Sequence, residues 1–314
     1  MTPSILVVGD VMIDIVVNPE GPITLGADRL ATIRMLPGGS GANQAAWLAT
    51  EKVKVAYVGR VGRAEHQRQT ALLTTCGVNA FLAVDDVLPT GTTVTMLSRN
   101  GERSFFTDRG ANDRLRSADL PDALLDGVGL VLLSGYSFYG EGSRAAVLDL
   151  LAETRRRNIP FAIDPASHSF LRQAGPRNFL DWFDGARICF PNAVEAALLS
   201  GSEDVGRQLQ FLTRSFSVVV IKRGAEGAIA AEAGNSQRWK VSAARVKAVD
   251  TTGAGDAFVA GFLGAYSNGL GLEACLRRAV ELGTQSVMRL GGRPPADTVT
   301  TILPRGRGNP SRGR

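Results

Sequence analysis

The sequence contains few residues of the kinds that build disulfide frameworks or histidine metal sites. Its 314 residues include three cysteines, Cys76, Cys189 and Cys275, and two histidines, His66 and His168. Because the cysteines are far apart along the chain, their spacing matches neither a disulfide framework nor a zinc site. Two histidines leave little room for a histidine-based metal site or catalytic triad, so we expect both to be surface or supporting residues.

Long hydrophobic segments are also missing. The uncharged segment 257–272 contains glycine, serine and asparagine, and it is too short to cross a bilayer. No basic residue precedes the apolar run 5–8, as one would in a secretory signal peptide, and Asp10 follows that run closely. These features argue against membrane-spanning and secreted proteins, and we expect a soluble, cytoplasmic protein without a membrane partner.

The excess of positive charge lies at one end of the chain. The net charge is +5, and residues 305–314, R-G-R-G-N-P-S-R-G-R, contain four arginines and no acidic residue. The remainder of the chain is therefore nearly neutral, which argues against nucleic acid as a partner. We expect the segment to be a disordered, inert tail, with weak RNA binding as the alternative for an Arg-Gly sequence.

Short apolar runs alternate with amphipathic segments in a chain that is 44% hydrophobic. This alternation is typical of an α/β fold with a mostly parallel sheet. No linker is long enough to separate two domains, so we predict one domain over residues 1–304. The predicted strands are 5–8, 55–58, 80–84, 130–133, 159–163, 188–190 and 218–221. The predicted helices are 42–49, 64–76, one that contains 147–154, two that begin at Val194 and Val205, and finally 254–268 and 272–290.

Two regions, near 12–36 and 91–108, break this alternation. Asn100-Gly101 favours a type I′ turn between two strands, because both residues accept positive φ. We interpret the two regions as a small β-lid that projects from the main sheet, and its exposed strand edges favour a homodimer. The strand-like segments of this lid are 13–17, 31–36, 92–98 and 102–107.

The most informative motif lies in residues 249–263, V-D-T-T-G-A-G-D-A-F-V-A-G-F-L. Gly253 and Gly255 precede apolar residues at helical spacing, which places bare backbone at a helix N-terminus. Unpaired N–H groups and the helix dipole there suit a phosphate. Asp256 is placed to accept a proton from an alcohol. An ordinary helix cap is the less favoured alternative, because the full string D-T-T-G-A-G-D is much more specific than a cap requires.

A second glycine-rich segment, residues 37–44 or P-G-G-S-G-A-N-Q, also opens a helix. Gly38, Gly39 and Gly41 allow the backbone to approach a ligand closely. Asn43 offers both a donor and an acceptor, which suits hydroxyl groups. Taken alone, the segment fits a simple turn from strand to helix equally well.

The two motifs and their order resemble the ribokinase family, the phosphofructokinase-B superfamily of carbohydrate kinases, over residues 4–295. The resemblance implies a three-layer α/β/α sandwich with a β-lid. It also implies an enzyme that uses ATP and Mg²⁺ to phosphorylate a hydroxyl group of a small carbohydrate, with Asp256 as the catalytic base. By the same resemblance the backbone of Gly253, Ala254 and Gly255 is the anion hole, and the sugar-binding residues include Gly38, Gly39, Ser40 and Asn43.

A third segment, residues 191–195 or P-N-A-V-E, matches the N-x-x-E element of the family. The match implies that Asn192 faces the nucleotide phosphates and that Glu195 holds Mg²⁺ through water. The alternative is local: Asn192 caps a helix, and Glu195 is a favourable charge in its first turn.

Residues 221–227, I-K-R-G-A-E-G, resemble the nucleotide-binding loop of the family. The resemblance implies that Lys222 reaches the phosphates and that Gly224 and Gly227 admit the adenosine. For Lys222, a solvated lysine at a strand end is an equal alternative.

On the sugar side, Asp14 matches a position that commonly binds substrate hydroxyls in the family, with Asp10 as a neighbouring competitor. Arg103 and Arg109 lie on or after the lid hairpin, where they would clamp an acidic or phosphorylated sugar. Solvated arginines on a β-ribbon are an alternative at least as good for each of them.

The substrate stays open at this point, since a pentose, a nucleoside and a hexose derivative all fit. Residues 162–169, A-I-D-P-A-S-H-S, lack the D-x-N-x-R run of several hexulose and keto-deoxy-sugar kinases, and Ser40 stands where ribokinases often have lysine. Asp250 and Gly291-Gly292 resemble the places where some members bind a monovalent cation such as K⁺. Some aromatic side chains could stack on a base or a sugar, although packing in the core or the lid is commoner for such residues. They are Phe105, Phe106, Tyr136, Phe138 and Tyr139.

Three other functions compete with a sugar kinase. An adenosine-like nucleoside kinase would use the same fold. A non-catalytic nucleotide or sugar sensor is disfavoured by the intact Asp256. A dinucleotide-dependent oxidoreductase is weak, because G-D-V-M-I-D follows the first strand in place of G-x-G-x-x-G.

Overall fold

The computed structural model describes residues 4–22, 26–97, 103–138 and 140–295. The predicted Asn100-Gly101 turn, Tyr139 and the 305–314 tail lie outside these ranges. None of the helices within them has the length and hydrophobicity that a bilayer crossing requires.

The core of the fold is a nine-stranded sheet in the order β13-β12-β11-β10-β9-β8-β1-β4-β5. All pairings from β5 to β11 are parallel, and β12 and β13 join antiparallel at one edge. The sheet is therefore mostly parallel, as the alternating pattern predicts. Its strands are β1 (Ser4–Val8), β4 (Val55–Gly62), β5 (Asn79–Asp85), β8 (Val128–Ser134), β9 (Phe161–Asp164), β10 (Ile188–Cys189), β11 (Val218–Lys222), β12 (Ala228–Glu232) and β13 (Arg238–Val241).

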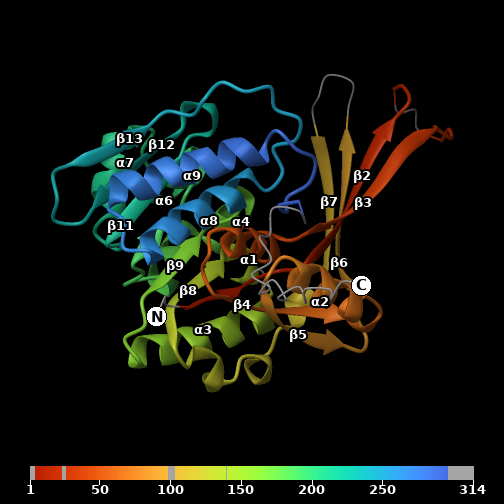
Figure 1. Cartoon of the computed structure of the whole chain (residues 1–314), viewed down its shortest axis with the longest axis horizontal. Coiled ribbons are helices and arrows are strands. Elements are labelled where there is room, and N and C mark those ends of the chain that lie inside the picture. Colours follow the sequence, from red (N-terminus) through yellow and green to blue (C-terminus); the bar gives the residue numbers. More distant parts are fainter. Residues whose placement is uncertain (1–3, 23–25, 98–102, 139, 296–314) are drawn as a thin grey trace, which may run out of the picture.

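Helices cover both faces of this sheet, because alternate residues of each buried strand point to opposite sides. In β1, Ile5 and Val7 join one core with α1, α2, α8 and α9, whereas Leu6 and Val8 join a second core with α3 to α7. Figure 1 shows the resulting three layers. The helices are α1 (Ser40–Thr50), α2 (His66–Thr75), α3 (Glu141–Arg156), α4 (His168–Ala174), α5 (Pro176–Trp182), α6 (Ala193–Ser200), α7 (Val205–Leu212), α8 (Ala254–Ser267) and α9 (Leu272–Ser286).

A separate four-stranded sheet forms the lid, in the order β3-β2-β6-β7. It projects from the layered body at the upper right of Figure 1. One face of the lid looks into the cavity described below, and Ile33, Met35 and Phe106 are exposed on the lid. Its strands are β2 (Met12–Pro19), β3 (Ala31–Gly38), β6 (Thr90–Leu97) and β7 (Arg103–Gly110).

The predicted elements are all present, but some of their bounds are wrong. The last helix ends at Ser286 rather than 290. The Val287 carbonyl accepts the N–H groups of Val249 and Asp250, so that it bonds to the segment before α8 instead of continuing the helix. Short helices α4 and α5 and the antiparallel strands β12 and β13 were not predicted. These are short segments with weak periodicity, and tertiary packing decides their conformation.

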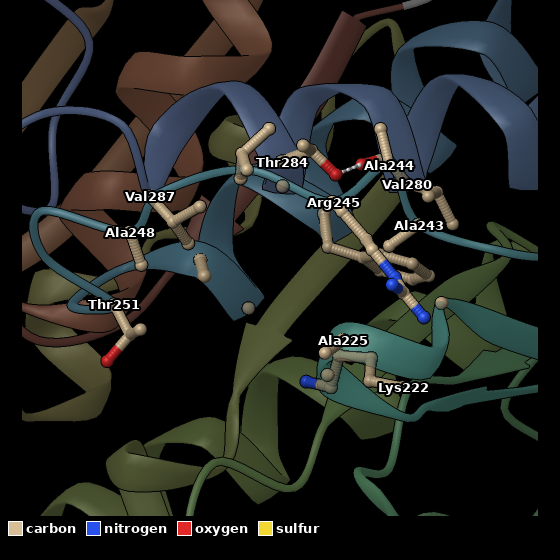
Figure 2. A pocket seen from close by; sticks show the side chains of 17 residues that line it. Lys222, Ala225, Ala243, Ala244, Arg245, Ala248, Thr251, Val280, Thr284 and Val287 are labelled. Atoms are coloured by element: carbon tan, nitrogen blue, oxygen red, sulfur yellow. Dashed lines mark hydrogen bonds between the residues drawn. The ribbon is translucent and has the colours of Figure 1, made fainter.

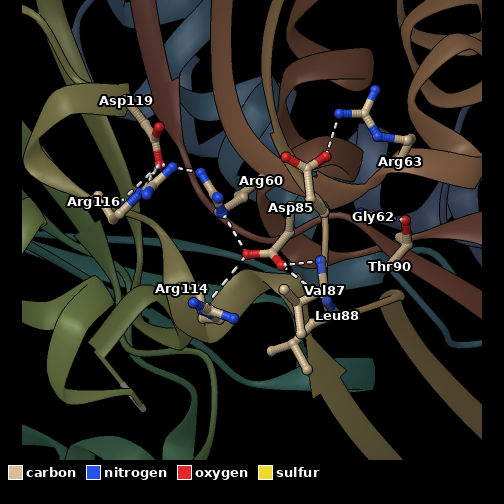
Figure 3. A network of polar contacts seen from close by, with 11 residues as sticks. Arg60, Gly62, Arg63, Asp85, Val87, Leu88, Thr90, Arg114, Arg116 and Asp119 are labelled. Atoms are coloured by element: carbon tan, nitrogen blue, oxygen red, sulfur yellow. Dashed lines mark hydrogen bonds and ion pairs between the residues drawn. The ribbon is translucent and has the colours of Figure 1, made fainter.

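A buried ion-pair network fastens the lid root to the body (Figure 3). Arg60 at the end of β4 donates to Asp85 at 3.0 Å and to Asp119 at 2.8 Å, and both Arg60 and Asp85 are almost inaccessible. Although burial opposes its ionisation, N–H donors at Leu88 and Val87 and the Arg60 guanidinium lower the pKa of Asp85 to about 2. The network thus joins the end of β5, which precedes lid strand β6, to the short 3₁₀ helix Ser117–Asp119.

We expect Arg60→Met to destabilise the fold by about 3–5 kcal/mol, because it leaves the Asp85 charge buried with one partner fewer. The measurement is the free energy of unfolding from urea titration. Arg63→Met is the matched control, because Arg63 pairs with Asp86 at the exposed surface, and it should cost less than about 1 kcal/mol. Equal effects of the two variants would contradict the importance of the buried network.

Candidate active site

Polar residues, three of them singled out by sequence, gather at the carboxyl ends of the parallel strands. Asp10 follows β1, Asp164 ends β9, Asn192 follows β10, and Lys222 ends β11. All four line one cavity of about 960 Å³, together with the start of α8 and the inner face of the lid. Open α/β sheets bind ligands at this edge, so the topology itself brings these side chains together.

The start of α8 forms one wall of this cavity. Residues 253–256 line it, and Gly253 at the N-cap has φ of 73°. A side chain at Gly253 would also collide with Gly292, because an added Cβ would lie 2.5 Å from the Gly292 Cα. The glycine is thus required on two counts, and the first turn of α8, where helical N–H groups lack intrahelical partners, borders the cavity.

Asp256 is a buried carboxylate held by two side chains of α1. Ser40 Oγ donates to its Oδ1 at 2.7 Å, and Asn43 Nδ2 donates to its Oδ2 at 3.0 Å. Burial raises the pKa of Asp256 to about 8, against the lowering effect of these two hydrogen bonds, and Asp164 and Asp10 raise it further. The two glycine-rich motifs therefore meet through this carboxylate. Ser40 and Asn43, predicted to bind sugar, make their observed contacts with Asp256.

The polar chain continues across the cavity to Lys222. Gln44 Nε2 donates to Ser40 Oγ at 3.3 Å and to Asp164 Oδ2 at 3.1 Å, and Lys222 Nζ donates to Asp164 Oδ1 at 2.7 Å. Gln44 and Asp164 were missed as site residues. The signal that could have found Asp164 is a carboxylate at the end of a buried parallel strand.

Lys222 is a largely enclosed ammonium paired with Asp164, and this pairing argues against the alternative of a solvated lysine. Although burial disfavours its charge, Asp164 and Glu195 raise the pKa of Lys222 above its ordinary value. Its Nζ lies beside the start of α8, 3.6 Å from the position of a Cβ added to Gly255. A fixed positive charge therefore adjoins the exposed helix amides.

Asn192 and Glu195 form a capping box at the start of α6. Asn192 Oδ1 accepts from the Glu195 N–H at 2.9 Å, and the Glu195 carboxylate accepts from the Asn192 N–H at 2.8 Å. Both residues also line the cavity. Burial raises the pKa of Glu195 to about 7, Lys222 lowers it, and Asp164 raises it. The local capping role is present, and the cavity-facing position expected from the resemblance is present with it.

The glycines of the first motif fit close contacts within the protein. A Cβ added at Gly39 would lie 2.5 Å from the Asp10 carbonyl oxygen, and one added at Gly41 would lie 2.5 Å from the Gly9 Cα. A Cβ added at Gly38 would lie 2.2 Å from Asp14 Oδ2. The strand-to-helix turn therefore accounts for all three glycines. Gly39 lines the cavity as well, whereas Gly38 is not among the lining residues and lies against the Asp14 carboxylate.

Two carboxylates face the end of the cavity under the lid. Asp10 and Asp14 both line it, and Asp10 accepts the N–H of Gly41 at 3.2 Å. Burial raises the pKa of Asp14 to about 6, with Asp10 adding to the rise and Arg293 opposing it. This end of the site is thus acidic.

Arg109 also lines the cavity, but its guanidinium is engaged. It donates to Asp113 at 2.7 Å and to the Tyr136 carbonyl at 2.8 Å. Arg103 begins β7 opposite Leu97, at the far end of the lid strands, and its side chain lies outside the described part of the structure. The other residues of this end include Thr93, Thr95, Phe105, Thr107, Tyr136 and His168, so His168 is a cavity residue. Phe138, in contrast, is core: it is buried and packs edge-on against Phe183.

A second cavity of about 560 Å³ adjoins the first at Lys222, Gly224 and the start of α8. Gly227, predicted to bind nucleotide, lines it. Apolar side chains dominate its walls, and in Figure 2 Val280 of α9 and Val287, which directly follows α9, lie across the pocket from Lys222 and Ala225. The pocket is therefore a mainly apolar cavity that borders the start of α8 at Ala254 and Gly255.

Asp250 closes the loop before α8. Its Oδ1 accepts the Thr252 N–H at 2.9 Å and its Oδ2 accepts the Gly291 N–H at 2.9 Å. Within the described residues no group of three or more His, Cys, Asp or Glu side chains is arranged to hold a metal ion. The observed contacts give Asp250 a role in loop structure, and a K⁺ site there stays a prediction.

Comparison with known proteins identifies a family that accounts for this geometry. The description pfkB family carbohydrate kinase matches residues 2–299. The ribokinase of Bacillus subtilis (strain 168) is 30% identical over 311 residues, which cover 96% of this chain and 99% of that protein. The resemblance drawn from the two motifs is confirmed.

Solved structures confirm the three-layer fold. The adenosine kinase from Sinorhizobium meliloti has a TM-score of 0.84 at 24% identity and covers 96% of this chain and 98% of its own. Arabidopsis thaliana ribokinase, complexed with ribose and ATP, has a TM-score of 0.79 at 28% identity, with 95% and 98% covered.

We expect the buried Asp256 to make stability depend on pH. An unfolded Asp loses its proton near pH 3.9, whereas folded Asp256 keeps it to about pH 8. The wild type therefore loses stability relative to Asp256→Asn as the pH rises from about 4 to 8, by up to about 1.4 kcal/mol per pH unit. Urea unfolding at several pH values measures this difference. Asp181→Asn at the exposed surface is the control, and a difference that is flat with pH for Asp256→Asn would contradict the pKa.

Proposed function

The chain belongs to the pfkB family of carbohydrate kinases, and from that membership and the site geometry we propose that it transfers the γ-phosphate of ATP to a hydroxyl group of a small, uncharged polyol. The observation that carries the proposal is the buried Asp256 carboxylate. It lines the lid-covered cavity next to Ala254 and Gly255 of α8, which line both that cavity and the apolar pocket. The two co-substrates would then react across this junction.

ATP fits the apolar pocket and its polar end. The adenine would lie between α9 and the loop that holds Gly224 and Gly227, where Val280 and Val287 supply apolar contact. Its phosphates would extend towards Lys222 and Asn192. The γ-phosphate would then reach the amides of residues 253–255, where a helix N-terminus favours negative charge. This assignment is supported by Arabidopsis thaliana ribokinase, whose structure contains ATP.

Asp256 would act as the general base for the acceptor hydroxyl. Ser40 and Asn43 hold both of its oxygens, so the carboxylate is oriented before substrate binds. A pKa near 8 places the proton affinity of this base close to neutral pH, where general bases are most effective. Phosphoryl transfer needs little proton abstraction, so positioning and charge stabilisation by Lys222 and the α8 amides would supply most of the acceleration.

The residues around Lys222 fit Mg²⁺ held mainly by substrate and water. Asp164 and Glu195 are buried carboxylates that line the cavity on the predicted phosphate side. Mg²⁺ prefers oxygen ligands and keeps several waters, so one or two such carboxylates suffice. Glu195, with Asp164, would hold the hydrated ion, which neutralises phosphate charge when bound.

The end of the cavity under the lid is where the acceptor would bind, and we call it the acceptor end. It favours an uncharged substrate over an acidic one. Asp10, Asp14 and Asp256 face it, whereas the Arg109 charge is compensated by Asp113. Hydroxyl groups can donate to these carboxylates, but a phosphate or carboxylate group on the acceptor would meet like charge. This disfavours the clamp of an acidic sugar that Arg103 and Arg109 suggested from sequence.

A nucleoside is the second candidate acceptor. Phe105 and Tyr136 line the cavity under the lid, where an aromatic face suits a base. The fold of an adenosine kinase is also closely similar. Sugar and nucleoside share the ribose-like hydroxyls that Asp14 would bind, so the same mechanism serves both.

Three further assignments complete the proposal. We propose that residues 1–304 act as one domain, in line with the family match over 2–299. The exposed Ile33, Met35 and Phe106 of the lid support a homodimer in which lids pair. K⁺ near Asp250 would act on the loop that precedes α8.

We expect Asp256→Asn to lower kcat by about 10²–10⁴-fold, the range typical of losing a general base, while ATP binding stays near wild type. The reason is that Asn keeps the shape of the side chain but cannot accept the proton. Steady-state ADP release and calorimetric ATP binding measure the two effects, with Asp181→Asn as surface control. Near wild-type turnover would rule out Asp256 as base, and ATP binding without turnover in the wild type on any acceptor would favour a sensor.

We also expect neutral acceptors to exceed their phosphorylated or acidic counterparts in kcat/KM by about 100-fold, because like charges a few ångströms apart cost about 2–4 kcal/mol in such a site. The measurement compares ribose with ribose 5-phosphate, fructose with fructose 6-phosphate, and a nucleoside with its monophosphate, with Mg²⁺ and with K⁺ added or withheld. A preference for the charged member of each pair would refute the uncharged class.

A further inference from the structure

Gly291, Gly292 and Arg293 lie a few residues after the end of α9, and we name them the C-terminal strap. The strap joins separate parts of the site. The Gly291 N–H donates to Asp250, and the Gly292 carbonyl accepts from Trp47 Nε1 at 2.8 Å. The Cα of Gly292 also packs on Gly253. The strap thus contacts both the loop before α8 and helix α1.

Arg293 extends this strap to the root of the lid. Its Nη2 donates to the Gly38 carbonyl, the last residue of β3, at 3.0 Å. Its Nε and Nη1 are inaccessible and have no hydrogen-bond partner within the described residues. Burial lowers the pKa of Arg293, whereas nearby Tyr57, Cys76 and Asp14 raise it and Arg68 lowers it. A guanidinium with two enclosed nitrogens and so few hydrogen bonds is costly to fold, and the carboxylate among its neighbours is Asp14.

Asp14 lies against the same glycine that Arg293 binds. A Cβ added to Gly38 would lie 2.2–2.4 Å from the carboxylate atoms of Asp14. Asp14 and Arg293 therefore flank Gly38, and Asp14 alone of the two lines the cavity. The charged groups that act on Asp14 are Asp10 and Asp250, which oppose its ionisation, and Arg293, which favours it.

We propose that Arg293 is a positioning residue of the acceptor site, whose partly buried positive charge keeps Asp14 ionised while its bond to Gly38 fixes the end of lid strand β3. The inference rests on the proposed function in one respect, namely that Asp14 accepts hydrogen bonds from acceptor hydroxyls. Arg293 itself touches no substrate. It acts from behind the Gly38 backbone.

The direction of the effect follows from the charges. An ionised Asp14 accepts two or more hydrogen bonds from a polyol, whereas the protonated form loses acceptor capacity. The pKa of Asp14 is already raised to about 6 by burial and by Asp10. Without Arg293 the acidic neighbours act unopposed, so protonation of Asp14 moves into the neutral range and acceptor binding weakens there. At high pH the carboxylate forms again and binding recovers.

The first test needs no turnover. The Asp14 carboxyl group is titrated by NMR in protein with ¹³C-labelled Asp, and Asp14→Asn assigns the signal. We expect Arg293→Met to raise the pKa of Asp14 by about one unit or more, the size of shift that loss of a nearby opposite charge produces. Arg293→Lys, which keeps the charge, should leave it close to wild type. An unchanged or lower pKa in Arg293→Met would overturn the proposal.

The matched control is Arg289→Met. Arg289 lies between α9 and the strap and is exposed at the surface, so its removal changes the net charge equally but should leave Asp14 unaffected. An equal shift in this control would overturn the proposal, because a general charge effect would then explain the result. If Arg293→Met does not fold, Arg293→Gln provides the neutral variant and the same outcomes apply.

The second test separates charge from structure through acceptor binding. Calorimetry measures the Kd of the best acceptor from pH 5 to 9. We expect Arg293→Met to weaken binding about tenfold at pH 6 and to approach wild type at pH 9, a recovery that a merely structural defect would not show. In an Asp14→Asn background, Arg293→Met should add no pH dependence. A loss that is constant with pH would overturn the charge role.

Failure of the two proposals gives different results. If the pKa of Asp14 shifts as expected but no acceptor binds or is phosphorylated, Arg293 keeps its effect on Asp14 and the proposed function fails. If acceptors are phosphorylated normally but the pKa does not shift, the proposed function stands and the inference about Arg293 is wrong.

Discussion

The hydrogen bonds between the Asp256 carboxylate and the side chains of Ser40 and Asn43 are the contact on which the rest of the site depends. They join residues more than two hundred positions apart in sequence. The start of α1 and the start of α8 thereby face each other across the carboxyl edge of the sheet. Because buried polar groups must be hydrogen-bonded, this carboxylate constrains the relative position of the two helices as well as its own orientation.

Burial then sets the electrostatics of the site. Asp256, Glu195 and Asp14 all have a pKa raised by burial, to about 8, 7 and 6. Lys222 and Arg293 oppose this accumulation of negative charge from two sides. Lys222 lies in the cavity beside the α8 amides, where phosphate groups would join it, and Arg293 lies behind the acceptor end. The same low-dielectric surroundings that make each carboxylate costly make each cation effective.

The lid depends on the body through a few polar contacts at its root. Arg60 pairs with Asp85 at the end of β5, just before lid strand β6. Asn112 donates to the Val11 carbonyl and accepts the Val11 N–H, just before lid strand β2. Arg293 donates to the Gly38 carbonyl at the end of lid strand β3. These contacts place the inner face of the lid over the acceptor end, so that Thr93 and Phe105 line the cavity although they lie on a separate sheet.

Much of this protein is determined by its sequence alone. The alternation of apolar runs predicts the parallel sheet, the strand pattern near 12–36 and 91–108 predicts the lid, and the string D-T-T-G-A-G-D places Asp256 at a helix start. These features are local, since they depend on periodicity and on the backbone freedom of a glycine such as Gly253. What only the tertiary structure decides is which side chains meet. Gln44 carries no local signal, Asp164 carries only its place at the end of a buried strand, and Arg293 follows the last helix in a segment that resembles a simple turn. Their roles arise because parallel strands end at one edge and distant segments pack there, where burial changes the pKa of a carboxylate and the partners of a charge.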